Sequence, residues 1–299
     1  MNMDRMAGAG ANEAARAPSV STAVLDGHPI DVGLDLLAAA DVTAIEPAYI
    51  AGYVDFDEDV FCAKEAHSWS ERASARGMRL SAVSAHTDLG AVDAIAYGAR
   101  RIRFAAELGV PIWVTNAAAT QNADAFFRAM ERLVELAEEA GIVIALENPG
   151  HGDDALVHDA KSGRDAVARI GSDHVRLNYD VGNALTYSKG AARPEADIVA
   201  ALPACASLHL KDVRDDPSGW TFTALGEGEI DWNHTLARTL TERPDLSLGI
   251  ELPLRLARPG RADPVRRTDP VPLDRIRSAV ETSLKTVEAA RQNVSPASA

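Results

Sequence analysis

Short apolar runs alternate with longer segments of helical periodicity along most of the chain. The runs are nearly continuous in apolar residues, as parallel strands covered on both faces are. The segments between them place apolar residues three and four positions apart, and two of them, 91–109 and 122–141, end in Gly109 and Gly141, the residue type that most often terminates a helix. The predicted strands span residues 20–25, 42–47, 80–86, 112–117, 142–148, 175–180, 206–212 and 246–252.

Eight strand–helix units in roughly 270 residues match the repeat of an α/β protein built as a single (β/α)8 TIM barrel. A doubly wound open sheet is the alternative, but no GxGxxG or phosphate-loop motif follows the first strand. We expect a barrel domain over residues 19–292, with disordered tails at 1–18 and 293–299. The Pro- and Arg-rich segment 254–272 is interpreted either as a solvated excursion or as a lid or oligomer contact over the barrel mouth.

Composition excludes several classes of protein. Hydrophobic residues make up 46% of the chain and charged residues 25%, as in ordinary globular proteins. The formal net charge of -14 disfavours binding to nucleic acid, because phosphates attract Lys and Arg. Cys62 and Cys205 lack the CxxC spacing of a thiolate metal site. Neither a signal peptide nor an apolar run of about eighteen residues occurs, so we expect no membrane span and a cytoplasmic protein.

Polar residues close most of the predicted strands, and the active site of a TIM barrel forms at these carboxyl ends. Burying carboxylates there without a counter-charge would cost several kcal/mol each, so a bound cation is expected. We select Glu147, Asp180, His209 and Glu251, from four consecutive strands, as ligands of one divalent ion. Three carboxylates and one imidazole favour Mn²⁺, with Mg²⁺, Co²⁺ or Zn²⁺ also possible. A helix cap or a surface ion pair is the alternative for any single carboxylate.

Lys211 lies two residues beyond His209 and should face the same side of its strand. We predict that it contacts a substrate oxygen or an enolate, with a salt bridge to a barrel carboxylate as the alternative. Other polar residues are candidates for substrate binding, and structural hydrogen bonds or helix capping are the alternatives for them. They are Glu46, His86, Asn116, His151 and Asn183.

Several motifs resemble those of the xylose isomerase-like barrels, a family that includes sugar-phosphate isomerases and epimerases, ketose 3-epimerases and repair enzymes of the endonuclease IV type. The resemblance implies the ligand set named above, with Glu147 and Glu251 as acid/base groups. Members often have a His where this chain has Asn183, and the nearest His after Glu147 is His151. These departures, with the acidic net charge, argue against the multi-zinc repair branch. The motifs are ALEN (145–148), NYDVGN (178–183), SLHLKD (207–212), LGEGEIDW (225–232) and GIEL (249–252).

These inferences predict a metal-dependent isomerase or epimerase that acts on a small-molecule sugar or polyol through an enediolate. Two carboxylates flanking the substrate would move a proton between faces or between carbons. One alternative uses the same site for elimination, as a keto-sugar lyase or dehydratase, including the barrel subunit of a 3-keto C-glycoside-cleaving enzyme with a small second subunit. Another is a non-catalytic sugar-binding barrel. We otherwise expect a homo-oligomer.

Overall fold

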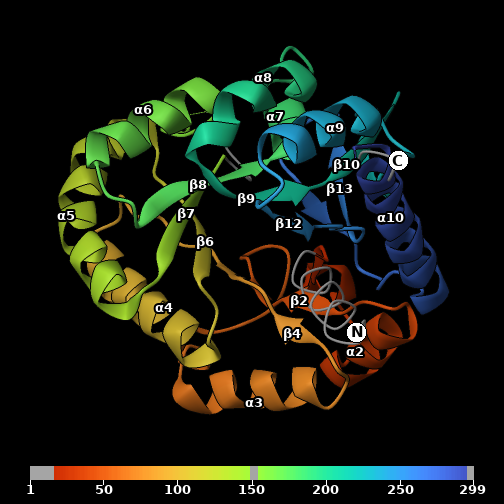
Figure 1. Ribbon diagram of the computed structural model, residues 1–299, viewed down its shortest axis with the longest axis horizontal. Helices are drawn as coiled ribbons and strands as arrows, with labels where there is room; N and C mark the ends of the chain where they lie inside the picture. The colour runs from red at the N-terminus through yellow and green to blue at the C-terminus, as the bar shows by residue number, and fades with distance from the viewer. Residues whose placement is uncertain (1–16, 149–153, 295–299) are drawn as a thin grey trace, which may run out of the picture.

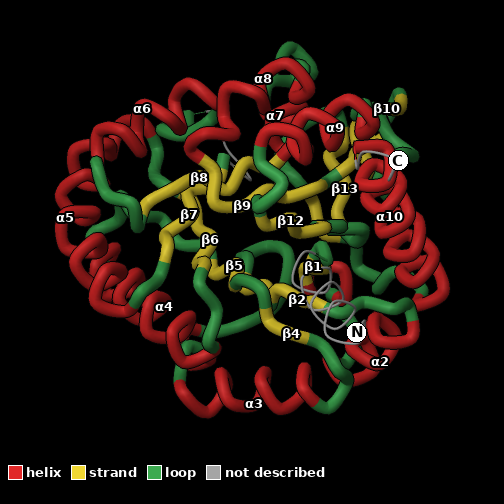
Figure 2. Tube along the Cα trace, viewed as in Figure 1, coloured by secondary structure: helices red, strands yellow, loops and turns green. Residues whose placement is uncertain are grey.

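The computed structural model describes residues 17–148 and 154–294 of the 299-residue chain. Helices form a ring around a central group of strands in Figure 1, and Figure 2 shows the strands in yellow inside the red helices. The paired strands of this central sheet are all parallel. A closed parallel sheet inside a layer of helices is the predicted TIM barrel, which the structure confirms.

All eight predicted strand regions form barrel strands. The second region contains β2 (Ala44–Glu46) and ends at Pro47, which separates β2 from the short strand β3 (Ala48–Tyr49) beyond the predicted end, because proline has no N–H to donate. The third region is divided into β4 (Arg79–Leu80) and β5 (Val83–Ala85). Since β2 pairs with β4, β3 pairs with β5, and β1 pairs with both β2 and β12, the sheet closes on itself. The other barrel strands are β1 (Ser19–Ser21), β6 (Ile112–Asn116), β7 (Val143–Glu147), β8 (Val175–Asp180), β9 (Cys205–Leu210) and β12 (Ser247–Ile250).

The helices lie outside the sheet, and their ends follow local signals. Gly109 and Gly141 both adopt the left-handed conformation after a helix, with φ of 72° and 67°, so the predicted helix ends are confirmed. The first strand is shorter than predicted because Thr22–Leu25 turns into a 3-10 helix whose first turn is capped by Ser21. The α-helices are α2 (Ile30–Ala39), α3 (Ala63–Ser74), α4 (Ala94–Leu108), α5 (Ala123–Ala140), α6 (Ala160–Ile170), α7 (Val181–Tyr187), α8 (Pro194–Ala201), α9 (Trp232–Glu242) and α10 (Leu273–Val294). Short 3-10 helices also occupy Glu58–Val60, Thr120–Asn122 and Leu202–Ala204.

A second, antiparallel sheet contains part of segment 254–272. Its strands are β10 (Asp212–Asp216), β11 (Gly219–Thr223), β13 (Leu256–Pro259) and β14 (Val265–Arg266). Arg258 is buried and donates to Thr186 Oγ1 of α7 at 3.0 Å. Arg266 donates to Asp26 and Asp55, which lie in the loops after β1 and β3. The segment is therefore fixed to loops at the carboxyl ends of the barrel strands rather than free in solvent.

Apolar side chains fill the space between the barrel and its helices. In β7, Ile144 and Leu146 belong to the large core cluster shared with the helices, whereas Ala145 belongs to a small separate cluster with Val114. Successive residues of a strand point to opposite faces, so these two sets mark the outer face and the interior of the barrel. Within residues 17–148 and 154–294, no helix has the length and apolarity needed to cross a bilayer.

Candidate metal centre

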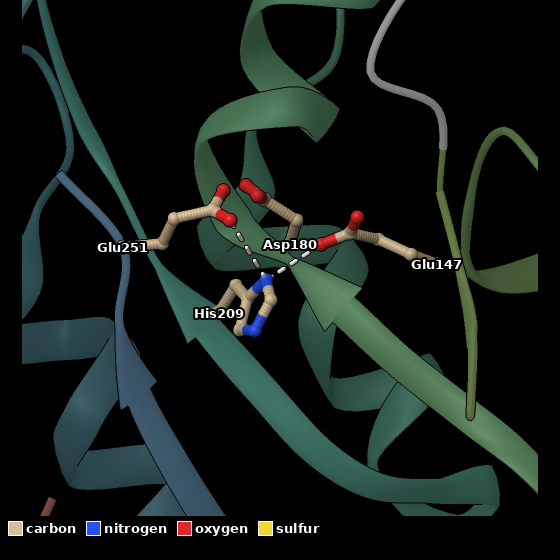
Figure 3. A group of neighbouring side chains, drawn as sticks. All are labelled: Glu147, Asp180, His209 and Glu251. Atoms are coloured by element: carbon tan, nitrogen blue, oxygen red, sulfur yellow. Dashed lines mark hydrogen bonds and ion pairs between the residues drawn. The ribbon is translucent and has the colours of Figure 1, made fainter. Parts of the chain in front are cut away.

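The four predicted metal ligands lie together at the carboxyl ends of their strands. Glu147 ends β7, Asp180 ends β8 and caps α7, His209 lies in β9, and Glu251 directly follows β12. Each offers a ligand atom within 4.8 Å of the others, and none is more than 2% exposed. Figure 3 shows the side chains of Glu251 and Glu147 approaching His209 from opposite sides, with Asp180 between them.

Hydrogen bonds and ion pairs hold these side chains in place. Nδ1 of His209 lies 2.7 Å from Oε1 of Glu147 and 3.8 Å from Oε1 of Glu251. Lys211 Nζ lies 2.7 Å from Oδ2 of Asp180 and 2.5 Å from Oε2 of Glu251. Lys211 therefore faces the same side as His209, as its spacing predicted, and it pairs with two of the candidate ligands.

The charges of the cluster change the proton affinities of its members. Burial alone would raise the pKa of Glu147, but His209 and His86 beside it hold that pKa well below its ordinary value. Burial raises the pKa of Asp180 to about 6 although Lys211 opposes the shift. The pKa of His209 is well above its ordinary value because Glu46, Glu147 and Glu251 outweigh its burial. Without a bound metal, the cluster thus retains protons that a cation would displace.

The residues present fit a hard divalent ion. The ligand set supplies carboxylate oxygens and one imidazole, and none of the four is a thiolate. Oε1 of Glu251 is buried and has no hydrogen-bond partner among the described residues. Together with Glu46, the cluster buries four carboxylates against the ammonium of Lys211 and the imidazole of His209, an excess of negative charge that a divalent ion would reduce.

A cavity of about 750 Å³ opens above this cluster, within the range of small-molecule sites. Its lining contains both polar and apolar residues. The polar lining includes His86, Asn116, Glu147, Asn183, Lys211 and Glu251, and the apolar lining includes Ile50, Tyr53, Ala117, Ala118, Val157 and Pro264. The cavity therefore presents the candidate ligands to any molecule bound in it.

The predicted substrate-binding residues occupy different places. His86, Asn116 and Asn183 line the cavity; His86 Nε2 lies 3.1 Å from Oε2 of Glu147, and Asn183 Oδ1 accepts from Lys211 at 3.2 Å. Glu46 is not among the described residues that line the cavity. It is buried behind His209 and accepts a hydrogen bond from Nε2 at 2.9 Å. His151 lies outside the described residues.

Some cavity residues were not singled out from the sequence. Tyr53 and the carboxylates Asp88, Asp154 and Asp263 line the cavity, and each lies in a connection between elements rather than in a strand. Asp263 belongs to the segment 254–272, whose unusual length was the one signal that pointed to the barrel mouth. The other three carry no comparable pattern.

Comparisons with known proteins agree with this architecture. A family model described as xylose isomerase-like TIM barrel matches residues 34–267. A solved xylose isomerase domain protein from Planctomyces limnophilus is similar at 15% identity and a TM-score of 0.69, covering 94% of this chain and 98% of that one. A D-tagatose 3-epimerase-like protein shares 18% identity at a TM-score of 0.69, covering 93% and 99%.

A further similar structure is the probable 3-DHS dehydratase AsbF, involved in petrobactin synthesis, from Bacillus anthracis. It shares 12% identity at a TM-score of 0.66, covering 91% of this chain and 98% of that one. A search of curated proteins found no match. At such low identities, the structural similarities establish a shared fold.

Proposed function

Because the chain belongs to the xylose isomerase-like TIM barrel family, we propose that it is a metal-dependent isomerase or epimerase of sugars or polyols that acts through an enediolate. One observation carries this proposal: Glu147 and Glu251 approach the same buried cluster from opposite sides and both line the cavity. This arrangement provides a cation site and two proton carriers at the position where a substrate would bind.

Glu147, Asp180, His209 and Glu251 would hold the ion, with Mn²⁺ favoured over Mg²⁺, Co²⁺ or Zn²⁺ by the oxygen-rich set. When bound, a divalent ion would polarise the carbonyl of a hydroxy-ketone and acidify the adjacent C–H bond. Asp180 also accepts from the backbone N–H of Asn183 at 2.8 Å, and Lys211 pairs with its other oxygen. These contacts hold the Asp180 carboxylate in one orientation.

Glu147 and Glu251 are the proposed acid/base groups. One carboxylate removes the proton from the substrate carbon, and the other returns a proton to the opposite face or to the neighbouring carbon. His86 contacts Glu147 from the cavity side and is placed to orient a substrate hydroxyl. The ammonium of Lys211, which also lines the cavity, offsets negative charge that develops on the substrate oxygens.

The cavity lining favours an uncharged sugar over a sugar phosphate. Asp88, Asp154 and Asp263 contribute carboxylates to the lining. Lys211 and His86 are the basic residues among the described lining residues, and both already pair with carboxylates. Phosphate recognition typically uses Arg or Lys groups that can donate to its oxygens.

Proton NMR in D2O tests the proposal directly. Metal-loaded protein is incubated with a panel of ketoses, their phosphates, hydroxy acids and 3-keto-glycosides. We expect incorporation of solvent deuterium at the carbon next to the carbonyl together with formation of an epimer or isomer, and faster turnover of the unphosphorylated sugar. Loss of a β-substituent would instead identify the same site as a lyase or dehydratase. Binding without exchange or turnover across the panel would identify a non-catalytic sugar-binding barrel.

A further inference from the structure

A chain of hydrogen bonds crosses the interior of the barrel beneath the cavity. Glu46, at the end of β2, is 3% exposed and accepts from Nε2 of His209 at 2.9 Å. Ser84 of β5 donates to the same Glu46 oxygen at 2.5 Å. On the other side of the imidazole, Nδ1 of His209 lies 2.7 Å from Glu147, which also accepts from Asn178 at 3.0 Å. His209 is thus held between two buried carboxylates.

Gly249 lies directly against the contact between Glu46 and His209. This residue lies in β12, which pairs with β9 on one side and with β1 on the other. A Cβ atom at position 249 would stand 3.1 Å from Oε2 of Glu46 and 3.1 Å from Cδ2 of His209. Glycine at this position therefore leaves room for both side chains, since an added Cβ would force Glu46 or His209 to shift by a few tenths of an ångström.

The two ring nitrogens of His209 face different surroundings. Nε2 points to Glu46, away from the ligand cluster, whereas Nδ1 points to Glu147 and Glu251. Figure 3 shows the same nitrogen directed at both carboxylates. A neutral imidazole carries one N–H, and the hydrogen bond that one nitrogen makes decides which nitrogen is left to bind a metal.

We propose that Glu46 is a positioning residue for the metal site: it accepts the Nε2–H of His209, so that Nε2 keeps its proton and Nδ1 is the nitrogen that binds the ion. Carboxylates that accept a hydrogen bond from a ligating histidine fix its orientation and strengthen its ligation. Glu46 lies behind the ring and is not among the described residues that line the cavity. Ser84 supports it by fixing the carboxylate. The proposal rests on the metal site proposed above.

Titration calorimetry with Mn²⁺ on the full-length chain tests this role. Glu46→Ala should weaken Mn²⁺ binding by about tenfold to a hundredfold, the effect usual for loss of such a partner. Glu46→Gln keeps an acceptor oxygen without the charge and should give a smaller loss. Asp197→Asn is the control, because Asp197 accepts hydrogen bonds from Tyr179 and Ala160 rather than from His209. Wild-type affinity in Glu46→Ala would overturn the proposal, whereas absence of Mn²⁺ binding in the wild type would overturn the metal site itself.

A second readout separates positioning from general stability. In protein labelled with ¹⁵N-histidine and loaded with Zn²⁺, we expect His209 to show a protonated Nε2 and a metal-bound Nδ1. In Glu46→Ala, His209 should no longer show this one tautomer alone, and in Glu46→Gln the protonated Nε2 with a metal-bound Nδ1 should return. A metal-bound Nε2 in the wild type, or an unchanged spectrum in Glu46→Ala, would contradict the assignment.

Discussion

The two faces of strands β7, β8, β9 and β12 differ sharply although both are buried. The outer face packs against the helices with large aliphatic and aromatic side chains, and the interior face ends in charged groups at the barrel mouth. Both faces follow from the same alternation of side chains along a strand. The outward residues are Ile144, Leu146, Leu177, Tyr179, Leu208, Leu210, Leu248 and Ile250, and the inward ones include Glu147, Asn178, Asp180, His209 and Glu251.

This difference separates stability from function. Burial of apolar area stabilises the fold by roughly 25 cal/mol per Å² whichever apolar residue is used. Buried charge has the opposite effect, because each uncompensated ion costs several kcal/mol. The outer face should therefore tolerate exchange among apolar residues of similar volume. The charges of the interior face, in contrast, are explained by a cation or by a reaction that needs them.

Replacing an interior carboxylate should have the largest effect. Glu251→Gln preserves shape but removes a ligand charge and a proton carrier, so turnover should fall by about 10² to 10⁴. Steady-state kinetics on the substrate identified by NMR measures this fall in turnover. Glu288→Gln, an exposed change on α10, is the control and should leave turnover intact. Full activity in Glu251→Gln would show that Glu251 is neither a needed ligand nor a needed proton carrier, and would contradict a catalytic role of the interior face.

On the outer face, Ile144→Ala should destabilise the protein by about 2–5 kcal/mol, since it leaves a cavity in fully buried packing. Chemical denaturation monitored by circular dichroism measures the change. The folded variant should still bind Mn²⁺ with wild-type affinity. If metal binding instead weakened while stability was unchanged, the separation between the two faces would be incorrect.

Lys211→Met removes a buried ammonium from the interior face. Its ammonium lines the cavity and pairs with Asp180 and Glu251, so we expect kcat to fall by about a hundredfold, as when a preorganised electrostatic donor is lost. Metal content is measured on the same sample. Retained metal with reduced kcat supports a role toward the substrate, and lost metal would show that Lys211 acts by holding the two ligands. The exposed Lys161→Met serves as the control.

Changing the pH should alter metal affinity by less than the substitutions above alter turnover or stability, and in proportion to the change in pH. An ion bound through Nδ1 must displace a proton from His209, whose pKa is well above its ordinary value, and Asp180 titrates at about 6. Lowering the pH therefore protonates the ligands, and affinity should fall by about tenfold for each pH unit, with a proton released on binding. Calorimetry in two buffers of different ionisation enthalpy detects that proton. A pH-independent affinity without proton release would show that the ligands are not the groups named here.

The sequence predicted the barrel and the place of the four candidate ligands because both depend on local pattern. Most apolar runs ended in a polar residue, and barrel geometry brings such ends together, so Glu147, Asp180, His209 and Glu251 were identifiable as candidates. The interruption at Pro47 also has a local cause, the missing N–H of proline. That the barrel still closes is visible only in the structure, where β2 pairs with β4 and β3 pairs with β5.

Other features depend on contacts between distant parts of the chain. The antiparallel sheet joins segments 212–223 and 256–266, and neither carries a pattern that identifies its partner. Glu46 was recognised as a polar strand end but was assigned to substrate, since its contact with His209 spans 163 residues and appears only when the barrel closes. The choice of Nδ1 as the inward nitrogen of His209 likewise depends on that contact.

Metal stoichiometry tests the central claim most directly. Protein purified without chelator, stripped of metal and then titrated with Mn²⁺, should bind one ion per chain, and Glu147→Gln should lose most of that binding, because one buried four-residue set provides the ligands. Elemental analysis after dialysis gives the count. Two or more tightly held ions per chain, or no binding of any of Mn²⁺, Mg²⁺, Co²⁺ and Zn²⁺, would contradict a single metal centre at the barrel mouth.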